Sequence, residues 1–183
     1  LLNTGLEEKR AQVSSAYDHF KEAGDSEKAE YEKALLDTID TILSFCDRYR
    51  LEAKRQGNHT VADTLSRIPS QKPATFLEAL QFMRIIHYCL WCSFNYHNTL
   101  GRFDQYMYPF YKHDIDAGIL TKDTALELIE EFFISLNRDS DLYTGMQQGD
   151  NGQSMVLGGI NPDGSDSFNE LSDLCLQADR KST

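Results

Sequence analysis

The chain has 183 residues, 40% of them hydrophobic, which is enough for one domain with a real core. Its formal net charge of −11 argues against binding to nucleic acid, because such binding calls for a basic patch. No apolar run approaches the roughly 20 residues that cross a bilayer, and the first residues lack the features of a signal peptide. We therefore expect a cytoplasmic protein that binds neither nucleic acid nor membrane.

The four cysteines are too few for a disulfide scaffold in a chain of this size. Cys89 and Cys92 form a C-x-x-C pair, but they fall in an apolar, helical context. No second Cys or His pair completes a zinc site, and the histidines lack the spacing that places two ligands on one helix face. We interpret all four as ordinary thiols and expect no metal site in this chain.

The first third of the chain is predicted to be helical. Residues 6–24 are charged and mildly amphipathic, and residues 27–55 carry one apolar stripe at alternating spacings of three and four. Asp25 or Ser26 is the expected N-cap of the second helix, because their side chains accept from free backbone N–H groups. A short helix is expected to start at Thr60.

A rigid link between Pro69 and Pro73 precedes a more apolar helix. Thr75 and Glu78 form a capping-box pattern, which predicts a helix over residues 75–93. This helix is apolar nearly all round, as is typical of a helix buried in a large structure. We expect its uncovered face to be buried by another copy of the chain or by a rearrangement.

Proline and threonine divide the next part of the chain. Pro109 removes a backbone donor and its ring clashes with the preceding turn, so a broken helix is expected up to Asp116. Thr121 is the expected cap of a helix that runs to Asn137. Residues 139–153 are polar and glycine-rich, which predicts a loop.

The last part of the chain contains a predicted strand and a further helix. Residues 155–160 read as a short strand, and residues 161–164, Asn-Pro-Asp-Gly, as a tight turn. Asp166 or Ser167 is expected to cap a last helix that begins near Phe168. The pattern is predominantly helical with one or two strands, an α/β class, and it shows no internal domain boundary.

The most informative stretch is residues 97–111, HNTLGRFDQYMYPFY. Gly101 allows a turn or a close approach of the backbone, and Arg102 and Asp104 place opposite charges two residues apart. The tyrosines add large rings whose hydroxyls need partners when buried. Taken alone, the stretch is explained equally well as a buried structural corner.

With its neighbours, this stretch resembles the barrel domain of the glycyl radical enzymes, the pyruvate formate-lyase-like superfamily. Other matching segments occur in the same order, so that the resemblance covers roughly residues 40–178: residues 67–69 with 73–81, residues 114–121, and residues 158–164 with 169–172. In that family two five-stranded parallel halves close a ten-stranded α/β barrel. The resemblance implies that residues 1–183 are a single piece of this barrel, with outer helices and one or two strands.

The resemblance also implies a chemistry. The family stores a radical on a glycine near the C-terminus of the full protein, and a cysteine on a central loop abstracts hydrogen from the substrate. Neither the glycine loop nor the cysteine loop is found in this chain, so we expect no catalytic residue in it and no activity of the chain by itself. A separate S-adenosylmethionine activase installs the radical, and no cofactor is expected in this chain.

The resemblance assigns the substrate wall to two groups of residues. The positions that face the substrate in relatives, just before the Gly-Arg pair, are here Tyr96, His97, Asn98 and Thr99, with Gly152 and Gln153 also matching the pocket lining. The side chains of Tyr96, His97, Asn98 and Thr99 suit an oxygenated or amine-bearing substrate, since a few fixed polar groups set the orientation of a small ligand. The alternative is that His97 and Asn98 cap the end of the preceding helix.

A second group of residues is expected to be structural. Arg102 and Asp104 are interpreted as a buried ion pair that braces the turn presenting residues 96–99, because such pairs are more often structural than catalytic. Gly158 and Gly159 fit a strand end where the backbone lies close to a neighbour. The structural motif comprises Gly101, Arg102, Asp104, Gln105, Gly158 and Gly159.

Two hypotheses follow. In the first, the chain is a fragment of a glycyl radical enzyme, formate C-acetyltransferase-like in general class and nearest in motif to the dehydratase, decarboxylase and C–N lyase branch. Its partners are then the remainder of the polypeptide, the activase, a small-molecule substrate and further copies in a homo-oligomer. In the second, the chain is a non-catalytic acidic helical interaction module or a degenerate paralogue.

Overall fold

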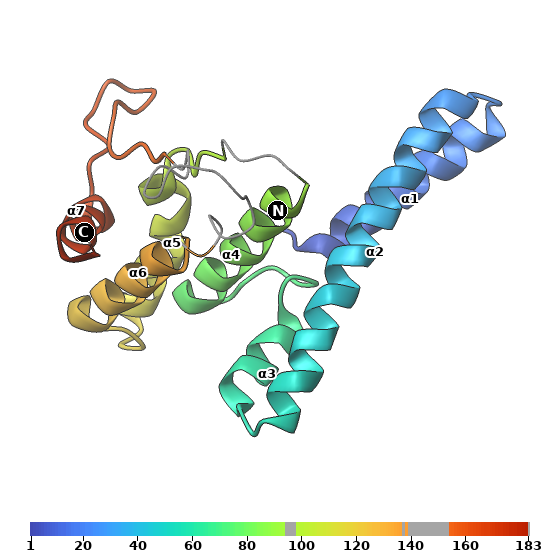
Figure 1. Cartoon of the computed structure of the whole chain (residues 1–183). Coiled ribbons are helices and arrows are strands. Elements are labelled where there is room, and N and C mark those ends of the chain that lie inside the picture. The colour runs from blue at the N-terminus through green and yellow to red at the C-terminus, as the bar shows by residue number, and fades with distance from the viewer. Residues whose placement is uncertain (94–97, 137, 139–153, 183) are drawn as a thin grey trace, which may run out of the picture. The chain divides into compact units, whose positions relative to one another are not determined.

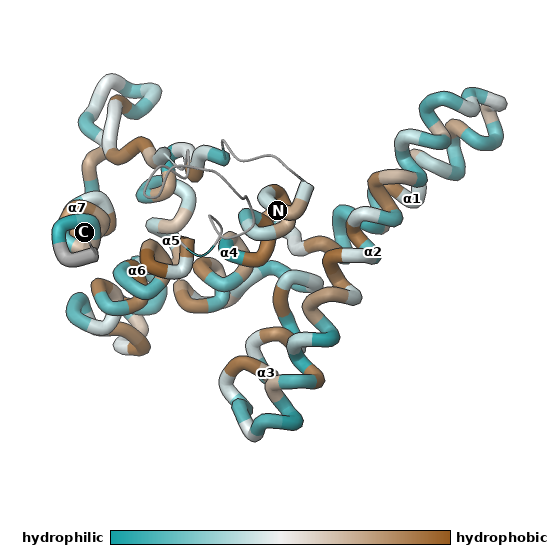
Figure 2. Tube along the Cα trace, viewed as in Figure 1, coloured by the Kyte–Doolittle hydropathy of each residue, from teal (hydrophilic) through white to brown (hydrophobic). Residues whose placement is uncertain are grey.

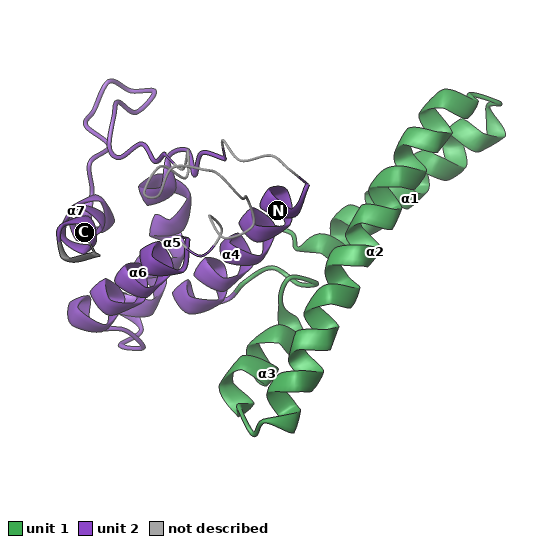
Figure 3. Cartoon of the chain, viewed as in Figure 1, with its two compact units in different colours: residues 1–73 green, residues 74–183 purple. Residues whose placement is uncertain are grey.

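The computed structural model describes residues 1–93, 98–136, 138 and 154–182. The chain divides into two compact units, residues 1–73 and residues 74–183, which Figure 3 shows in different colours. The boundary falls at Pro73, the end of the link predicted from its two prolines. That all 183 residues form a single piece of one domain stays a prediction.

Unit 1 consists of three helices, α1 (Leu6–Glu22), α2 (Ser26–Arg55) and α3 (His59–Arg67) (Figure 1). The helix α2 packs against α1 along one part of its length and against α3 along another. The predicted cap of α2 is confirmed, because the carboxylate of Asp25 accepts from the backbone N–H of Lys28. The cap of α3 is Asn58, which accepts from the N–H of Val61, so this helix begins one residue earlier than predicted.

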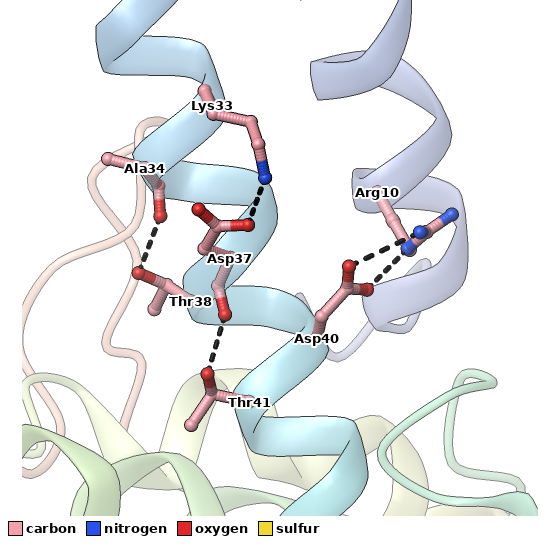
Figure 4. Close-up of polar contacts among 7 residues, drawn as sticks. All are labelled: Arg10, Lys33, Ala34, Asp37, Thr38, Asp40 and Thr41. Carbon is pink, nitrogen blue, oxygen red and sulfur yellow. Dashed lines mark hydrogen bonds and ion pairs between the residues drawn. The ribbon is translucent and has the colours of Figure 1, made fainter.

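An ion pair joins α1 to α2 on the surface of unit 1. The Nε and Nη2 atoms of Arg10 donate to the two carboxylate oxygens of Asp40, at 2.6 and 3.3 Å (Figure 4). The hydrogen bond from Arg10 lowers the pKa of Asp40, and the charge of the guanidinium acts in the same direction. Both side chains are more than 40% exposed, so we expect the pair to fix alignment more than stability.

The N-terminus of α1 is closed by the segment that follows α3. The N–H groups of Leu6 and Glu7 donate to the carbonyls of Pro69 and Ser70, at 2.8 and 3.0 Å. These bonds satisfy two of the donors that a helix start leaves unpaired. Gly5 makes the approach possible, since its φ is 83° and a Cβ there would lie 2.4 Å from the Ser70 carbonyl oxygen.

Unit 2 contains α4 (Phe76–Cys92), α5 (Phe103–Asp116), α6 (Lys122–Leu136) and α7 (Glu170–Ser182) (Figure 1). The predicted caps of α4 and α6 are confirmed, because Thr75 accepts from Glu78 N–H and Thr121 accepts from Thr124 N–H. Most residues of α4 are apolar, as the colouring by hydropathy in Figure 2 shows. No helix of the described residues is long and apolar enough to span a membrane.

Aromatic packing and one buried carboxylate hold α4, α5 and α6 together. The ring of Phe103 on α5 stacks on Phe132 of α6 with centroids 5.5 Å apart. The carboxylate of Asp114 on α5 is 1% exposed and accepts from the N–H of Phe76 at 2.7 Å. A negatively charged carboxylate is favourable at the start of α4, because the helix dipole has its positive end there.

The prediction that Pro109 breaks the helix before Asp116 is wrong. The helix α5 runs through Pro109 without interruption, and Pro109 itself lies exposed on its outer side. The buried side chains of Phe103, Met107 and Tyr111 lie on one face of α5. We attribute the continuity to this packing, which outweighs the single backbone hydrogen bond that proline removes.

The predicted strand over residues 155–160 is also wrong. The described residues contain no strand, only two isolated bridges, Gly101 with Met155 in parallel and Ile160 with Asp166 in antiparallel. Gly158 and Gly159 have φ values of 66° and 107°, which interrupt an extended backbone. The one or two barrel strands expected from the sequence are therefore absent from the described residues, and the regular elements in the described part of unit 2 are helices.

Candidate functional site

Two segments more than 50 residues apart in the sequence lie side by side at the start of α5. The N–H of Leu100 donates to the carbonyl of Ser154 at 2.7 Å, and the N–H of Val156 donates to the carbonyl of Gly101 at 2.8 Å. Gly101 and Met155 thereby form a parallel bridge. Tyr106 adds a further contact from α5, because its hydroxyl donates to the Leu100 carbonyl at 2.8 Å.

Tyr106 serves this contact as a neutral donor. Burial raises the pKa of its hydroxyl well above the ordinary value of 10.0, and the nearby Cys175 adds to the shift. The hydroxyl therefore stays protonated through the physiological range and keeps its bond to Leu100. The segment before Arg102 is thus held from both sides, by Ser154 and by Tyr106.

The predicted ion pair between Arg102 and Asp104 is not present in the described residues, where each side chain instead binds the later segment. Arg102 Nη2 donates to the Gly158 carbonyl at 3.0 Å and to the Ser167 hydroxyl at 2.7 Å. Asp104 Oδ2 accepts from Gly158 N–H at 2.6 Å and from the hydroxyl of Ser172. Both side chains therefore hold the segment at Gly158, instead of forming an ion pair with each other.

Gln105 completes this arrangement, which we call the clasp and define as Arg102, Asp104 and Gln105. Its amide Nε2 donates to the Ser167 carbonyl at 2.8 Å. In return, Asn169 Nδ2 donates to the Asp104 carbonyl at 3.3 Å. Each polar side chain of the Gly-Arg-x-Asp-Gln motif thus binds the segment of residues 158–172, which explains why these residue types occur together.

The clasp depends on the glycine pair Gly158 and Gly159. Both have positive φ values, 66° at Gly158 and 107° at Gly159, which other residues adopt only with strain. A Cβ at Gly158 would lie 3.3 Å from the ring of Phe168, and one at Gly159 would lie 3.4 Å from Arg102 Nη2. The Gly-Gly pair therefore provides both the backbone conformation and the room for the Arg102 side chain.

Asp104 is fully buried, at 0% exposure, and only one of its two carboxylate oxygens is bound within the described residues. Oδ2 accepts two hydrogen bonds, whereas Oδ1 has no hydrogen-bond partner there. The position in the first turn of α5 favours a negative charge, since the N–H groups of that turn point toward it. Losing this carboxylate would leave Gly158 N–H and Ser172 without an acceptor.

Only part of the predicted substrate wall falls in the described residues. Tyr96, His97, Gly152 and Gln153 lie outside them, and so does the predicted loop of residues 139–153. Asn98 is 6% exposed and Thr99 is exposed. Asn98 and Thr99, which belong to the first predicted group, and Ser154, which directly follows the second, lie in the segments that the bridge joins.

Sequence reasoning did not identify Ser167, Asn169 and Ser172 as partners of the clasp, although residues 169–172 belong to a segment that resembles the family. Asn169, and neither Asp166 nor Ser167, caps α7, because Asn169 Oδ1 accepts from the N–H groups of Leu171 and Ser172 at 2.9 and 3.1 Å. The asparagine directly before a helical pattern was the available signal. Ser167 carried no local signal, since its partner Arg102 is 65 residues away.

Two of the four cysteines, Cys89 and Cys175, are poor candidates for a reactive thiol. All four lie in helices, and burial raises the pKa of the Cys89 thiol to about 11 and that of Cys175 to about 12. A thiol with a raised pKa stays protonated and is a weak nucleophile. Among the described residues no group of three or more His, Cys, Asp or Glu side chains is placed to hold a metal ion.

Comparison with known proteins identifies the family. The model of the family described as "Pyruvate formate lyase-like" matches residues 1–182. The chain therefore belongs to this family, whose members are glycyl radical enzymes. Because the match spans both compact units, neither unit stands outside the family assignment.

Individual relatives agree with this assignment. The chain is 33% identical over 139 residues to trans-4-hydroxy-L-proline dehydratase of Clostridioides difficile, a match that covers 68% of the chain and 17% of the dehydratase. It is 34% identical over 137 residues to the 4-hydroxyphenylacetate decarboxylase glycyl radical subunit of the same species, covering 70% of the chain and 15% of that subunit.

A solved structure extends the likeness to the fold. The structure concerns 1,2-propanediol dehydration in Roseburia inulinivorans, and it matches with a TM-score of 0.87 at 25% identity. The match covers 99% of this chain and 24% of that one. The chain thus spans about a quarter or less of the length of these three relatives.

Proposed function

We propose that this chain is part of the catalytic barrel of a glycyl radical enzyme and supplies one wall of its substrate pocket. The observation that carries the proposal is the bridge between Gly101 and Met155. It joins the segment that directly follows Tyr96 and His97 to the segment that directly follows Gly152 and Gln153. In this proposal, the two groups of residues that the family resemblance assigns to the substrate contribute to the same wall.

In this proposal the chain's own residues bind and orient the substrate. Tyr96, His97 and Asn98 contact it from one segment, and Gly152 and Gln153 contact it from the other. The clasp keeps the second segment in place by holding Gly158, four residues beyond Ser154. A pocket with few, well-fixed polar groups favours a small oxygenated or amine-bearing metabolite.

The reaction we propose is that of a lyase. Two of the relatives named above are a dehydratase and a decarboxylase glycyl radical subunit, and the solved structure concerns dehydration of a diol. We place formate C-acetyltransferase activity second, because none of these three relatives carries it. When activated, the glycyl radical supplies hydrogen-atom abstraction from the substrate through a cysteine thiyl, after which elimination or C–C or C–N cleavage follows.

The radical glycine and the reactive cysteine lie, in this proposal, outside the 183 residues. The helical position of the four cysteines and the raised pKa of Cys89 and Cys175 support this placement. The chain by itself is then inactive, and its partners are the remainder of the polypeptide, a radical S-adenosylmethionine activase and further copies in a cytoplasmic homo-oligomer.

The test uses the complete protein that carries this chain, activated without oxygen by its activase and S-adenosylmethionine. Trans-4-hydroxy-L-proline, 4-hydroxyphenylacetate and 1,2-propanediol are supplied separately, and loss of each compound is followed by NMR against an unactivated control. We expect activation-dependent consumption of at least one compound. Radical formation without any turnover would contradict the substrate class, whereas the absence of a radical would favour a non-catalytic interaction module or a degenerate paralogue.

A further inference from the structure

The hydroxyl of Thr99 connects the two bridged segments. Its Oγ1 donates to the carbonyl of Ser154 at 2.8 Å and accepts from the N–H of Gly101 at 3.1 Å. The same Ser154 carbonyl accepts from Leu100 N–H at 2.7 Å. The side chain of Thr99 therefore repeats, from a second direction, the backbone contact that pairs these segments.

A threonine hydroxyl has a single proton to donate. In Thr99 that proton goes to Ser154, and one acceptor position is filled by Gly101. No proton is left with which Thr99 can donate to a substrate oxygen while the bridge is in place.

We infer that Thr99 is a positioning residue, whose hydroxyl fixes the spacing between the Asn98 segment and the Ser154 segment. This inference rests on the proposed function, in which both segments contribute to the substrate wall. Gly101 is held in a left-handed conformation with φ 62°, and its N–H points to Thr99 while its carbonyl accepts from Val156. Thr99 therefore orients the peptide groups on which the bridge depends.

Three variants test the inference. Thr99→Val removes the hydroxyl at nearly constant shape, and Thr99→Ser restores it. Thr121→Val makes the same chemical change in the same unit, where it removes the hydroxyl that caps α6 through Thr124 N–H at 3.2 Å. Amide hydrogen exchange of Leu100 and Val156 is measured by NMR in each full chain.

We expect exchange of these two amides to be several-fold faster in Thr99→Val and close to wild type in Thr99→Ser and Thr121→Val, since only Thr99→Val removes hydrogen bonds within the bridged segments. Exchange in Thr99→Val at the wild-type rate would overturn the inference. This measurement needs no ligand, so its result stands even when the proposed function fails.

Binding of trans-4-hydroxy-L-proline to the complete protein, titrated by calorimetry, provides the second readout. We expect the Kd to rise several-fold in Thr99→Val, to recover in Thr99→Ser, and to be unchanged in Thr121→Val. Weaker binding with unchanged exchange would make Thr99 a direct ligand, and faster exchange with unchanged binding would make its role merely structural; either overturns the inference.

If the wild type does not bind this compound, binding of 1,2-propanediol is titrated instead. Failure of both compounds counts against the proposed function, and the exchange rates alone then decide the role of Thr99.

Discussion

Gly5 offers the sharpest test of the packing in unit 1. Its backbone has φ 83° and ψ 173°, a conformation that is essentially restricted to glycine. A Cβ at this position would lie 2.4 Å from the Ser70 carbonyl oxygen and 2.5 Å from the Gln71 carbonyl carbon, which are both backbone atoms. Gly5→Ala therefore combines backbone strain with a clash that no side-chain rotation relieves.

The two effects add to a measurable loss. Backbone strain of this kind is about 1–3 kcal/mol, and overpacking adds about 1–3 kcal/mol, so we expect a decrease of roughly 2–6 kcal/mol in the free energy of unfolding. The shift that relieves the clash also weakens the bond from Glu7 N–H to the Ser70 carbonyl, and with it the start of α1.

Gly57→Ala is the matched control, because Gly57 also has a positive φ, 74°, but nothing lies within 4 Å of its added Cβ. We expect the free energy of unfolding of this variant to fall by about 1–2 kcal/mol, the strain that a left-handed conformation introduces in alanine. Urea denaturation followed by far-UV circular dichroism compares the two, and the emission of Trp91, the single tryptophan, reports on unit 2. Equal losses in the two variants would refute the close packing of Gly5 against residues 70 and 71.

Further predictions concern unit 2. Asp114→Ala should lower the free energy of unfolding by about 2–3 kcal/mol, because the buried N–H of Phe76 loses a charged acceptor, whereas Asp116→Ala, two residues on and exposed, should change it by less than about 0.5 kcal/mol; a urea melt decides between them. Arg102→Lys should lose about 1–2 kcal/mol, since an ammonium group does not reproduce the forked contact with Gly158 and Ser167, and a wild-type midpoint would count against the clasp. The free energy of unfolding should also fall as the pH rises from 9 to 12. In the folded chain the pKa of Cys175 is raised to about 12 from an ordinary 9.0, so the unfolded chain loses this proton at a lower pH than the folded chain does. Deprotonation therefore favours the unfolded state across this range. Melts across this range should show a smaller fall in Cys175→Val, while exposed Cys92→Ser should follow the wild type.

The helices could be predicted from the sequence because their signals are local. Asp25, Thr75 and Thr121 each accept a hydrogen bond from an N–H three residues later, so a short window contains the whole interaction. The seven helices of the described residues accordingly lie close to the predicted ranges. Pro109 is the exception, since a local rule about proline says nothing of the buried face that keeps α5 continuous.

The candidate site could be predicted only in part. The family motif identified Arg102, Asp104 and Gln105 as a unit, but their partners lie 54 to 68 residues further along the chain. Opposite charges two residues apart favoured an ion pair, whereas in the fold a backbone N–H and serine hydroxyls compete for the same groups. Such pairings depend on the tertiary structure, and no pattern within a single segment contains them.

We propose that this chain belongs to the catalytic part of an enzyme that works through a glycyl radical. The most direct test is electron paramagnetic resonance of the complete protein after anaerobic incubation with its activase and S-adenosylmethionine, with the 183-residue chain treated in parallel. The account predicts the doublet of a glycyl radical in the complete protein and no such signal in the chain alone. Absence of the doublet from a folded complete protein treated with a competent activase would contradict it.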